Sequence, residues 1–99
     1  MSKLRFEWDD TKAQINVRKH GVTFEEAATV FDDADAILFD DPDHSQDEDR
    51  FILLGMSLMA NVLIVCHCYR NEDQSIRIIS ARKATKKEAE EYAGYGKEW

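Results

Sequence analysis

The sequence predicts an α+β domain in which two N-terminal helices pack on a mainly antiparallel sheet that is followed by a C-terminal helix. After a short alternating run, two short helical patterns come first, and apolar, β-branched runs separated by polar turns follow them. A capped helical pattern then ends the chain. Strands joined by short turns pair antiparallel, so the helices are expected on the sheet and not between its strands.

Capping signals set most of the helix boundaries. Thr23 is followed by Glu26 with the spacing of a capping box, and Thr85 and Glu88 repeat that spacing. Gly21 stands where a left-handed residue would stop the first helix. In chain order we expect a strand over 4–8, a helix from Asp9 or Asp10 to about His20, a helix from Thr23 to about Phe31, a strand over 36–39, strands over 51–57 and 62–69 joined by a hairpin at 58–61, a strand over 75–83 and a helix from Thr85 to about Gly94.

The composition describes one small domain. Its 99 residues, of which 43% are hydrophobic, suffice for a single core, so we expect one domain over 1–99 with a flexible tail at 94–99. No apolar run approaches the ~20 residues of a membrane helix, and the start lacks the apolar segment of a secretory signal. Cys66 and Cys68 are too close along one strand to bridge easily, which favours reduced thiols. We therefore expect a cytoplasmic protein without a membrane partner.

The charge is unevenly divided along the chain. The net charge is −7, but the segment 32–49 holds nine of the 20 acidic residues and no Lys or Arg, which leaves the rest of the chain slightly basic. An acidic segment of this kind is either a solvated loop or a docking surface for a basic partner. The sequence leaves both interpretations open.

Positive charge is concentrated near the C-terminus. Five of the 13 basic residues fall between positions 77 and 87, with no acidic residue among them. The pattern places them at a strand end and a helix start, where side-chain cations and helix N–H groups together favour a phosphate or a carboxylate. These residues are Arg77, Arg82, Lys83, Lys86 and Lys87.

Four segments, FEWDDTKAQINVRKHGVTFEEAATVF, RFILLGMS, VCHCYR and IRIISARKATKKEAEEY, resemble the BrnT toxins of bacterial type II toxin–antitoxin modules, and the likeness runs from Phe6 to Tyr92. The resemblance implies a RelE-like fold and an RNA endonuclease that inhibits translation and growth. It also implies a BrnA-like antitoxin with a ribbon-helix-helix domain, through which alone the toxin would meet DNA. It implies no cofactor.

Metal-independent RNA cleavage needs a base, an acid and cations that stabilise the phosphate in the transition state. Arg82 is the strongest candidate, because a guanidinium binds phosphate through two parallel hydrogen bonds. Arg70 follows it at a strand end, and His67 could assist proton transfer. Each has a structural alternative: Arg82 in an ion pair with the acidic segment, and His67 as a buried histidine that bonds a backbone carbonyl.

A second set of residues is expected to hold RNA. Lys19 and His20 match the KHG element of the resembled toxins, although His20 at a helix C-terminus is explained more simply by the helix dipole. Cations bound to backbone phosphates would supply affinity, and the same charges also serve solubility. The expected RNA-binding residues are Lys19, His20, Arg77, Lys83 and Lys86.

Strand alternation separates the residues of the apparent Cys66-His67-Cys68 cluster. His67 should share a face with Val65 and Tyr69, opposite the two cysteines, so the three cannot hold one metal ion. The acidic segment also lacks the glycine and glutamate of a calcium loop, and no metal site is expected.

In a regular last strand, Ser80 and Arg82 lie on one face, and Arg77, Ile79 and Ala81 lie on the other.

Two functions of different kinds follow. The first is a ribonuclease toxin that binds RNA and a neighbouring antitoxin. The second is a non-catalytic toxin homologue that acts as an antitoxin-binding co-repressor subunit, which the acidic net charge favours.

Overall fold

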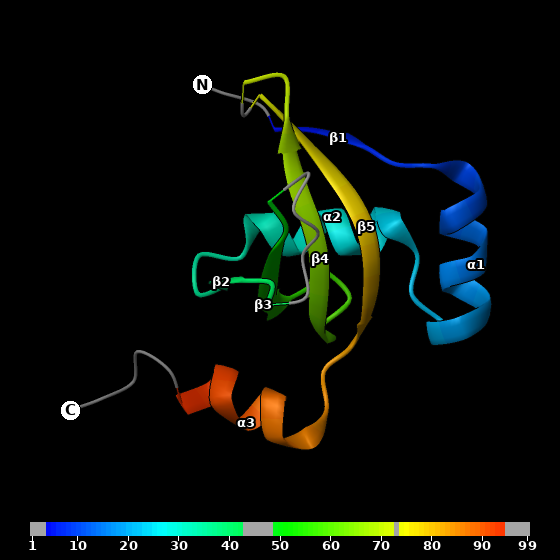
Figure 1. The fold of residues 1–99 in the computed structure, drawn as a ribbon. Coiled ribbons are helices and arrows are strands. Elements are labelled where there is room, and N and C mark those ends of the chain that lie inside the picture. Colours follow the sequence, from blue (N-terminus) through cyan, green and yellow to red (C-terminus); the bar gives the residue numbers. More distant parts are fainter. Residues whose placement is uncertain (1–3, 43–48, 73, 95–99) are drawn as a thin grey trace.

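The computed structural model describes residues 4–42, 49–72 and 74–94. In this part of the chain a five-stranded sheet is combined with three α-helices and one 3-10 turn (Figure 1). The elements are β1 (Arg5–Glu7), α1 (Asp10–His20), α2 (Phe24–Thr29), η1 (Val30–Asp32), β2 (Ile37–Asp40), β3 (Phe51–Met56), β4 (Val62–Arg70), β5 (Ser75–Lys83) and α3 (Lys86–Gly94).

The sheet has the strand order β1-β5-β4-β3-β2. From β2 to β5 every neighbouring pair is antiparallel, and β1 alone runs parallel to its neighbour β5. The consecutive strands β3, β4 and β5 are joined by short turns, which explains their antiparallel pairing. The predicted α+β class and mainly antiparallel sheet are therefore confirmed.

Local capping places the first two helices as the sequence predicted. The side chain of Asp9 accepts a hydrogen bond from the Lys12 N–H, and Gly21 ends α1 with a φ of 69°. Thr23 accepts from the Glu26 N–H at the start of α2. The Glu26 carboxylate accepts hydrogen bonds from the β3–β4 hairpin, 2.7 Å from Ser57 Oγ and 2.8 Å from Asn61 Nδ2. Glu26 thus ties α2 to the hairpin.

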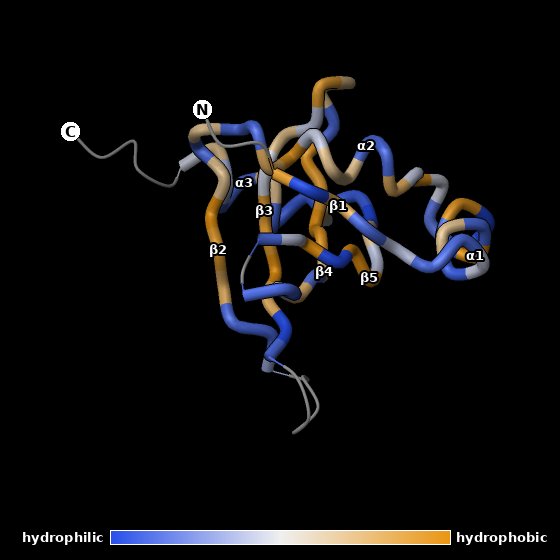
Figure 2. The backbone as a smooth tube through the Cα atoms, turned by 90° about the horizontal axis from the view of Figure 1, so that it is seen from above, coloured by the Kyte–Doolittle hydropathy of each residue, from blue (hydrophilic) through white to orange (hydrophobic). Residues whose placement is uncertain are grey.

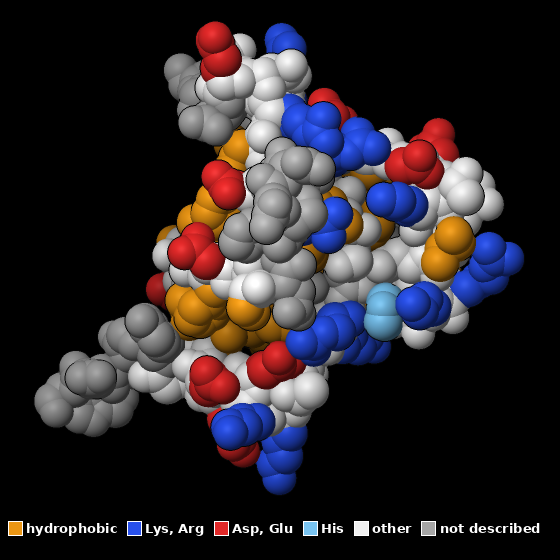
Figure 3. Space-filling view, viewed as in Figure 1, with side chains coloured by type: hydrophobic (Ala, Val, Ile, Leu, Met, Phe, Trp, Pro, Cys, Tyr) orange, Lys and Arg blue, Asp and Glu red, His pale blue; other side chains and the backbone are white. Residues whose placement is uncertain are grey.

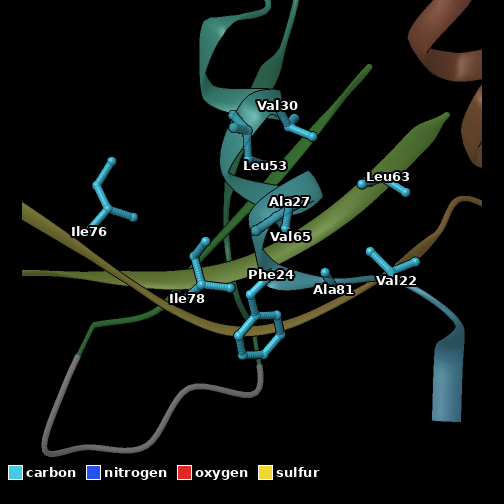
Figure 4. Close-up of a cluster of buried hydrophobic side chains, with 10 residues drawn as sticks. All are labelled: Val22, Phe24, Ala27, Val30, Leu53, Leu63, Val65, Ile76, Ile78 and Ala81. Carbon is cyan, nitrogen blue, oxygen red and sulfur yellow. The ribbon is translucent and has the colours of Figure 1, made fainter. Parts of the chain in front are cut away.

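The hydrophobic core lies between α2 and one face of the sheet. Figure 4 shows Phe24, Ala27 and Val30 directed from α2 and η1 toward the strands. Leu63 and Val65 of β4 meet them from the sheet, and all five side chains are fully buried. The ten residues of this core are Val22, Phe24, Ala27, Val30, Leu53, Leu63, Val65, Ile76, Ile78 and Ala81.

Helix α1 lies against the edge of β5 and not on the face of the sheet, which corrects the prediction that both N-terminal helices pack on it. Figure 1 shows α1 beside β5, while α2 lies behind the strands. Asn16 is the one residue of α1 that is buried. Its side chain accepts a hydrogen bond from Ala81 N at 3.1 Å and donates to Ala81 O at 2.8 Å. Few apolar side chains of α1 face the core. The hydrogen bonds of Asn16, which we call the clamp, therefore attach α1 to β5.

A β-bulge in β5 changes which side chains share a face. Cys66 pairs with Ser80, but His67 pairs with Ile78, so Ile79 is an extra residue in β5. Arg77, opposite Cys68, therefore faces the same way as Ser80, on the side of the sheet away from the core. The prediction that Arg77 and Ala81 share a face was wrong, because it assumed a regular strand.

Two polar contacts among the described residues connect helix α3 to the rest of the domain. Arg82 bonds Glu88, and the Tyr92 hydroxyl donates to Asp33 at 2.6 Å. No residue of α3 is buried. Gly94 is the last residue of the helix, and the predicted tail beyond it lies outside the described residues.

Residues 43–48 of the acidic segment also lie outside the described part of the chain, so the predicted solvated loop there stays a prediction. In the ranges that the structure describes, no helix has the length and apolar character needed to cross a membrane.

Candidate nucleic-acid interface

Three arginines lie on the sheet face that is turned away from α2. Arg70 follows Cys66 and Cys68 in the alternation of β4, and the bulge directs Arg77 to the same face. Arg82 pairs with Ile64 and also lies there. The extra residue in β5 thus gathers on one surface three cations that a regular strand would divide.

The three arginines do not converge on one point. Arg82 lies beside Ile64 near the start of β4, whereas Arg70 ends that strand six residues later, which corresponds to roughly 20 Å. Arg77 is near the Arg70 end, and its Nη1 lies 3.1 Å from Glu7 Oε2 of β1. The two arginines predicted to be catalytic, Arg82 and Arg70, therefore lie near opposite ends of β4 and not at one site.

Arg82 forms a two-pronged ion pair with Glu88 of α3. Its Nη1 lies 2.8 Å from Glu88 Oε1, and its Nη2 lies 2.9 Å from Glu88 Oε2. These hydrogen bonds raise the pKa of Arg82 and lower the pKa of Glu88 to about 2. Arg82 therefore forms an ion pair, but the predicted partner was wrong, because the carboxylate belongs to Glu88 of α3 and not to the acidic segment.

The ion pair does not occupy the whole guanidinium. A guanidinium carries five N–H donors. Glu88 takes one from each terminal nitrogen, and Lys83 O lies 3.3 Å from Nη1. The Arg82 side chain is 41% exposed, and Nε–H is among the donors that neither Glu88 nor Lys83 takes.

His67 is fully buried on the core side of the sheet. Its Nδ1 lies 3.2 Å from Val65 O and its Nε2 lies 3.4 Å from the Tyr69 hydroxyl. Phe31, Phe51 and Tyr69 surround the ring, with centroids between 4.8 and 6.2 Å away. Burial lowers the pKa of His67 because charging the imidazole there loses hydration. The predicted face of His67 is confirmed, and in this structure the imidazole is separated from the arginine face by the sheet.

The end of α1 that carries Lys19 and His20 is attached to the end of β5 that carries Arg82 and Lys83. Asn16 bonds Ala81, one residue before Arg82, and its Nδ2 also lies 2.9 Å from Val22 O, just after the KHG element. One side chain therefore fixes the end of α1 beside the end of β5. Figure 3 shows Lys and Arg side chains gathered over β5 and α1, while acidic and hydrophobic side chains predominate over β2.

We call the residues Lys19, His20, Arg82 and Lys83 the basic end. The side chains of Lys19, His20 and Lys83 are exposed. Lys86, at the first position of α3, is exposed as well. The basic end thus combines two segments that are more than 60 residues apart in the sequence.

The cysteines of β4 have no role at the basic end. Cys66 Sγ lies 3.4 Å from Asp41 Oδ2, and burial together with this carboxylate raises the pKa of Cys66 to about 12. The thiol is therefore neutral at physiological pH, and Cys68 is buried. Over the described ranges, no group of three His, Cys, Asp or Glu residues is arranged to hold a metal ion.

Sequence reasoning missed two residues that shape this interface. Asn16 gave no signal apart from being a polar residue in a helical pattern. Glu88 was assigned only to a capping box, which it does form with Thr85, and the same carboxylate also binds Arg82. Its position six residues after Arg82 would have been a usable hint, because the strand-to-helix turn between them is short.

Comparison with solved structures shows that the fold of the chain is similar to that of a solved bacterial toxin. The chain matches the 1.1 Å crystal structure of the Brucella abortus ribonuclease toxin BrnT with a TM-score of 0.64. The match covers 85% of this chain and 100% of that chain at 22% identity, a level that shows the fold alone.

Sequence comparison identifies the family. The model of the family described as "Ribonuclease toxin, BrnT, of type II toxin-antitoxin system" matches residues 8–88. The chain therefore belongs to the BrnT toxin family, as its motifs predicted. No curated protein matches the chain.

Proposed function

We propose that the chain is an RNA endonuclease toxin whose basic end binds the phosphate backbone of RNA without a metal ion or a cofactor. The observation that carries the proposal is the set of hydrogen bonds between the Asn16 side chain and the backbone of Ala81 and Val22, which joins the two basic segments at the ends of α1 and β5. Fixed cations spaced along a surface are what a phosphate chain requires. Family membership supports the same function.

Arg82 is the residue that we propose to stabilise the reacting phosphate. Glu88 fixes its guanidinium from one side and leaves Nε–H as a donor. Cleavage through the 2′-OH raises the negative charge on the phosphate oxygens, and a guanidinium held in advance stabilises that charge at little cost in reorganisation. Glu88 is then a positioning residue and Arg82 a catalytic one.

We place proton transfer at His20 and not at His67. A general base must come within hydrogen-bond reach of the 2′-OH. His67 has no exposed surface, whereas His20 is exposed at the end of α1, which Asn16 joins to β5 at Ala81, next to Arg82 in the sequence. In this proposal His67 serves packing, and Arg70, Arg77 and Lys86 bind parts of the RNA farther from the cleaved bond.

The partner in this proposal is a BrnA-like antitoxin with a ribbon-helix-helix domain, encoded beside the toxin gene. Toxin and DNA would meet only through that protein. Because RNA and the antitoxin would be met in the cytoplasm, we propose that the protein acts there.

The matched variants Arg82→Ala and Glu88→Gln test the enzyme directly. Both remove the ion pair, but only Arg82→Ala removes the guanidinium. We expect purified Arg82→Ala to lose at least about 100-fold in RNA cleavage, as expected for loss of a charged group that stabilises the transition state. Glu88→Gln should retain cleavage within about 10-fold.

Growth arrest on expression, relieved by co-expression of the neighbouring gene, should follow the same order in both variants. Equal losses in the two variants would show that the pair acts only in folding and would contradict a catalytic Arg82. Thermal unfolding of both variants provides the control for stability.

One observation favours the second candidate, a non-catalytic subunit that acts through antitoxin binding. Two arginines of the predicted site are engaged by carboxylates, the predicted catalytic Arg82 by Glu88 and the predicted RNA-binding Arg77 by Glu7, and the net charge is −7. Both features weaken attraction to RNA. Unimpaired growth on expression, absence of cleavage by the purified wild-type chain and tight binding of the antitoxin would together establish this alternative.

A further inference from the structure

Strand β2 forms one edge of the sheet, on the side of the molecule opposite α1 (Figure 2). Among the described strands it pairs with β3 alone. Leu38 and Phe39 are exposed on it by 51% and 39%. Successive side chains of a strand point to opposite faces, so this edge carries an accessible large apolar side chain on each face.

The main-chain groups of β2 that point outward can be identified from its pairing. Asp41 donates its N–H to Arg50 O, which it faces across the strand pair. In an antiparallel pair the residues that bond the partner alternate with residues whose N–H and C=O point away. Phe39 and Ile37 therefore direct these groups toward β3, whereas Leu38 and Asp40 direct theirs toward the open edge.

Proteins usually protect such an edge with Lys, Pro or a bulge. No Lys or Pro occurs within Ile37–Asp40, and the pairing of β2 with β3 is regular. Its charged groups are acidic, with exposed Asp40 at one end and exposed Asp35 just before the other. The edge thus offers apolar contacts on both faces, peptide groups that no described strand pairs, and negative charge at its ends.

We propose that the β2 edge binds the antitoxin by adding an extended segment of it as a sixth strand, with apolar residues that contact Leu38 and Phe39 and Lys or Arg residues near Asp35 and Asp40. This inference rests on the proposed function for the identity of the partner. Strand addition draws affinity from main-chain hydrogen bonds and specificity from alternate side chains. Opposite charges at the rim increase the rate of association.

A second copy of this chain fits the edge less well. Antiparallel pairing of two β2 strands would bring Asp35 and Asp40 from both copies to the ends of one short strand pair. Like charges placed opposite one another destabilise strand pairing. The acidic segment 32–49, which contains no Lys or Arg, supplies no compensating cation.

The location of the edge separates partner binding from RNA binding. Figure 2 places β2 and α1 at opposite sides of the molecule, so β2 lies across the sheet from the basic end. A partner strand on β2 would inhibit the toxin by carrying a further part of the antitoxin to the RNA surface, and not by covering Arg82 itself. Loss of β2 binding is therefore expected to leave cleavage by the free toxin intact.

Two substitutions at one position test the edge. The N–H of Leu38 points outward, so Leu38→Pro removes an edge donor and leaves the bonds to β3 in place, while Leu38→Ala removes only the side chain. We expect Leu38→Pro to bind the purified product of the neighbouring gene about 10-fold more weakly than Leu38→Ala does, as expected when a hydrogen bond is lost and the incoming strand is also obstructed. The control Ile15→Ala removes an apolar side chain that is 42% exposed on α1 and should bind as the wild type does.

Hydrogen exchange in the wild-type protein gives a second test that requires no variant. The amides of Leu38 and Asp40 should exchange more slowly in the complex than in the free chain. Equal affinities of Leu38→Pro and Leu38→Ala, unchanged exchange at both amides, or absence of any complex would overturn strand addition. RNA cleavage by free Leu38→Pro at the wild-type rate would show that such a failure concerns the docking edge and not the proposed ribonuclease.

Discussion

The side chain of Asn16 makes the hydrogen bonds to the Ala81 backbone that a neighbouring strand would otherwise make. Its side-chain amide bonds both the N–H and the C=O of Ala81, beyond the point where β1 stops pairing with β5. The same amide donates to Val22 O, one residue after the KHG element. The clamp therefore closes an open strand edge and holds the end of α1, which carries Lys19 and His20, to the end of β5, which carries Arg82.

Loss of this clamp should be costly. Asn16→Ala leaves buried peptide groups of Ala81 and Val22 without their side-chain partner, and we expect it to lower the free energy of unfolding by about 2–4 kcal/mol in urea titrations. Asn16→Asp should cost at least as much at neutral pH, because a carboxylate cannot donate to either carbonyl oxygen. The exposed neighbour Gln14→Ala is the control and should stay within about 0.5 kcal/mol of wild type. A mild effect of both Asn16 variants would contradict the clamp.

Gly55 is expected to tolerate no side chain. A Cβ at this position of β3 would lie 2.8 Å from Ala36 Cβ and 2.8 Å from Val30 Cγ1, so Gly55→Ala should lower the free energy of unfolding by about 1–3 kcal/mol through overpacking. Gly94→Ala is the matched control, because nothing lies within 4 Å of its Cβ position. Thermal denaturation of the two variants checks the prediction, and equal melting temperatures would refute it.

Burial of His67 should make stability depend on pH. Its pKa is lowered in the folded protein by loss of hydration, so the unfolded chain binds a proton more readily. Stability is then fully present above the unfolded pKa of about 6.5 and falls as the pH is lowered below it.

The variant His67→Phe isolates this effect. Urea midpoints measured between pH 7 and pH 5 should fall less steeply for His67→Phe than for the wild type. Glu88 contributes at lower pH, because its pKa is lowered to about 2 by Arg82 and its stabilising effect is lost only as the pH falls from about 4.5 toward that value. Parallel pH profiles for wild type and variant above pH 5 would contradict a neutral, buried His67.

Helix α3 should loosen when Tyr92 loses its hydroxyl. The hydroxyl donates to Asp33 at 2.6 Å, and this bond raises the pKa of Tyr92 to about 12. Because α3 buries no residue, Tyr92→Phe should speed amide exchange over Lys86–Gly94 several-fold while exchange in β4 changes little. Uniform acceleration in both elements would show instead that α3 unfolds only with the whole domain.

The sequence was sufficient for the features that are determined locally. Helix boundaries at Asp9, Gly21 and Thr23 follow from capping side chains and from a left-handed glycine, each within a few residues of the group that it satisfies. Alternation placed His67 with Val65 and Tyr69 correctly. The depth of His67 in the core depends on rings from η1 and β3, which no local pattern contains.

The features that the sequence could not supply depend on pairing across the sheet. The bulge at Ile79 arises from the register of β4 against β5, and it moves Arg77 to the face that carries Arg82. The Asn16 clamp joins residues 65 positions apart. The RelE-like fold and the catalytic roles of Arg82, Arg70 and His67 stay predictions. Because His67 is fully buried, we propose Arg82 and His20 as the reactive pair.

Titration with an RNA analogue tests most directly whether the basic end is one binding surface. In amide NMR spectra of the labelled protein, an oligonucleotide that lacks the reactive 2′-OH should shift Lys19, His20, Arg82 and Lys83 together with one dissociation constant, and added salt should weaken binding. Amides of β2 should not move. Shifts confined to one of the two basic segments, or no shifts at the basic end at concentrations where the wild-type chain cleaves RNA, would contradict the account.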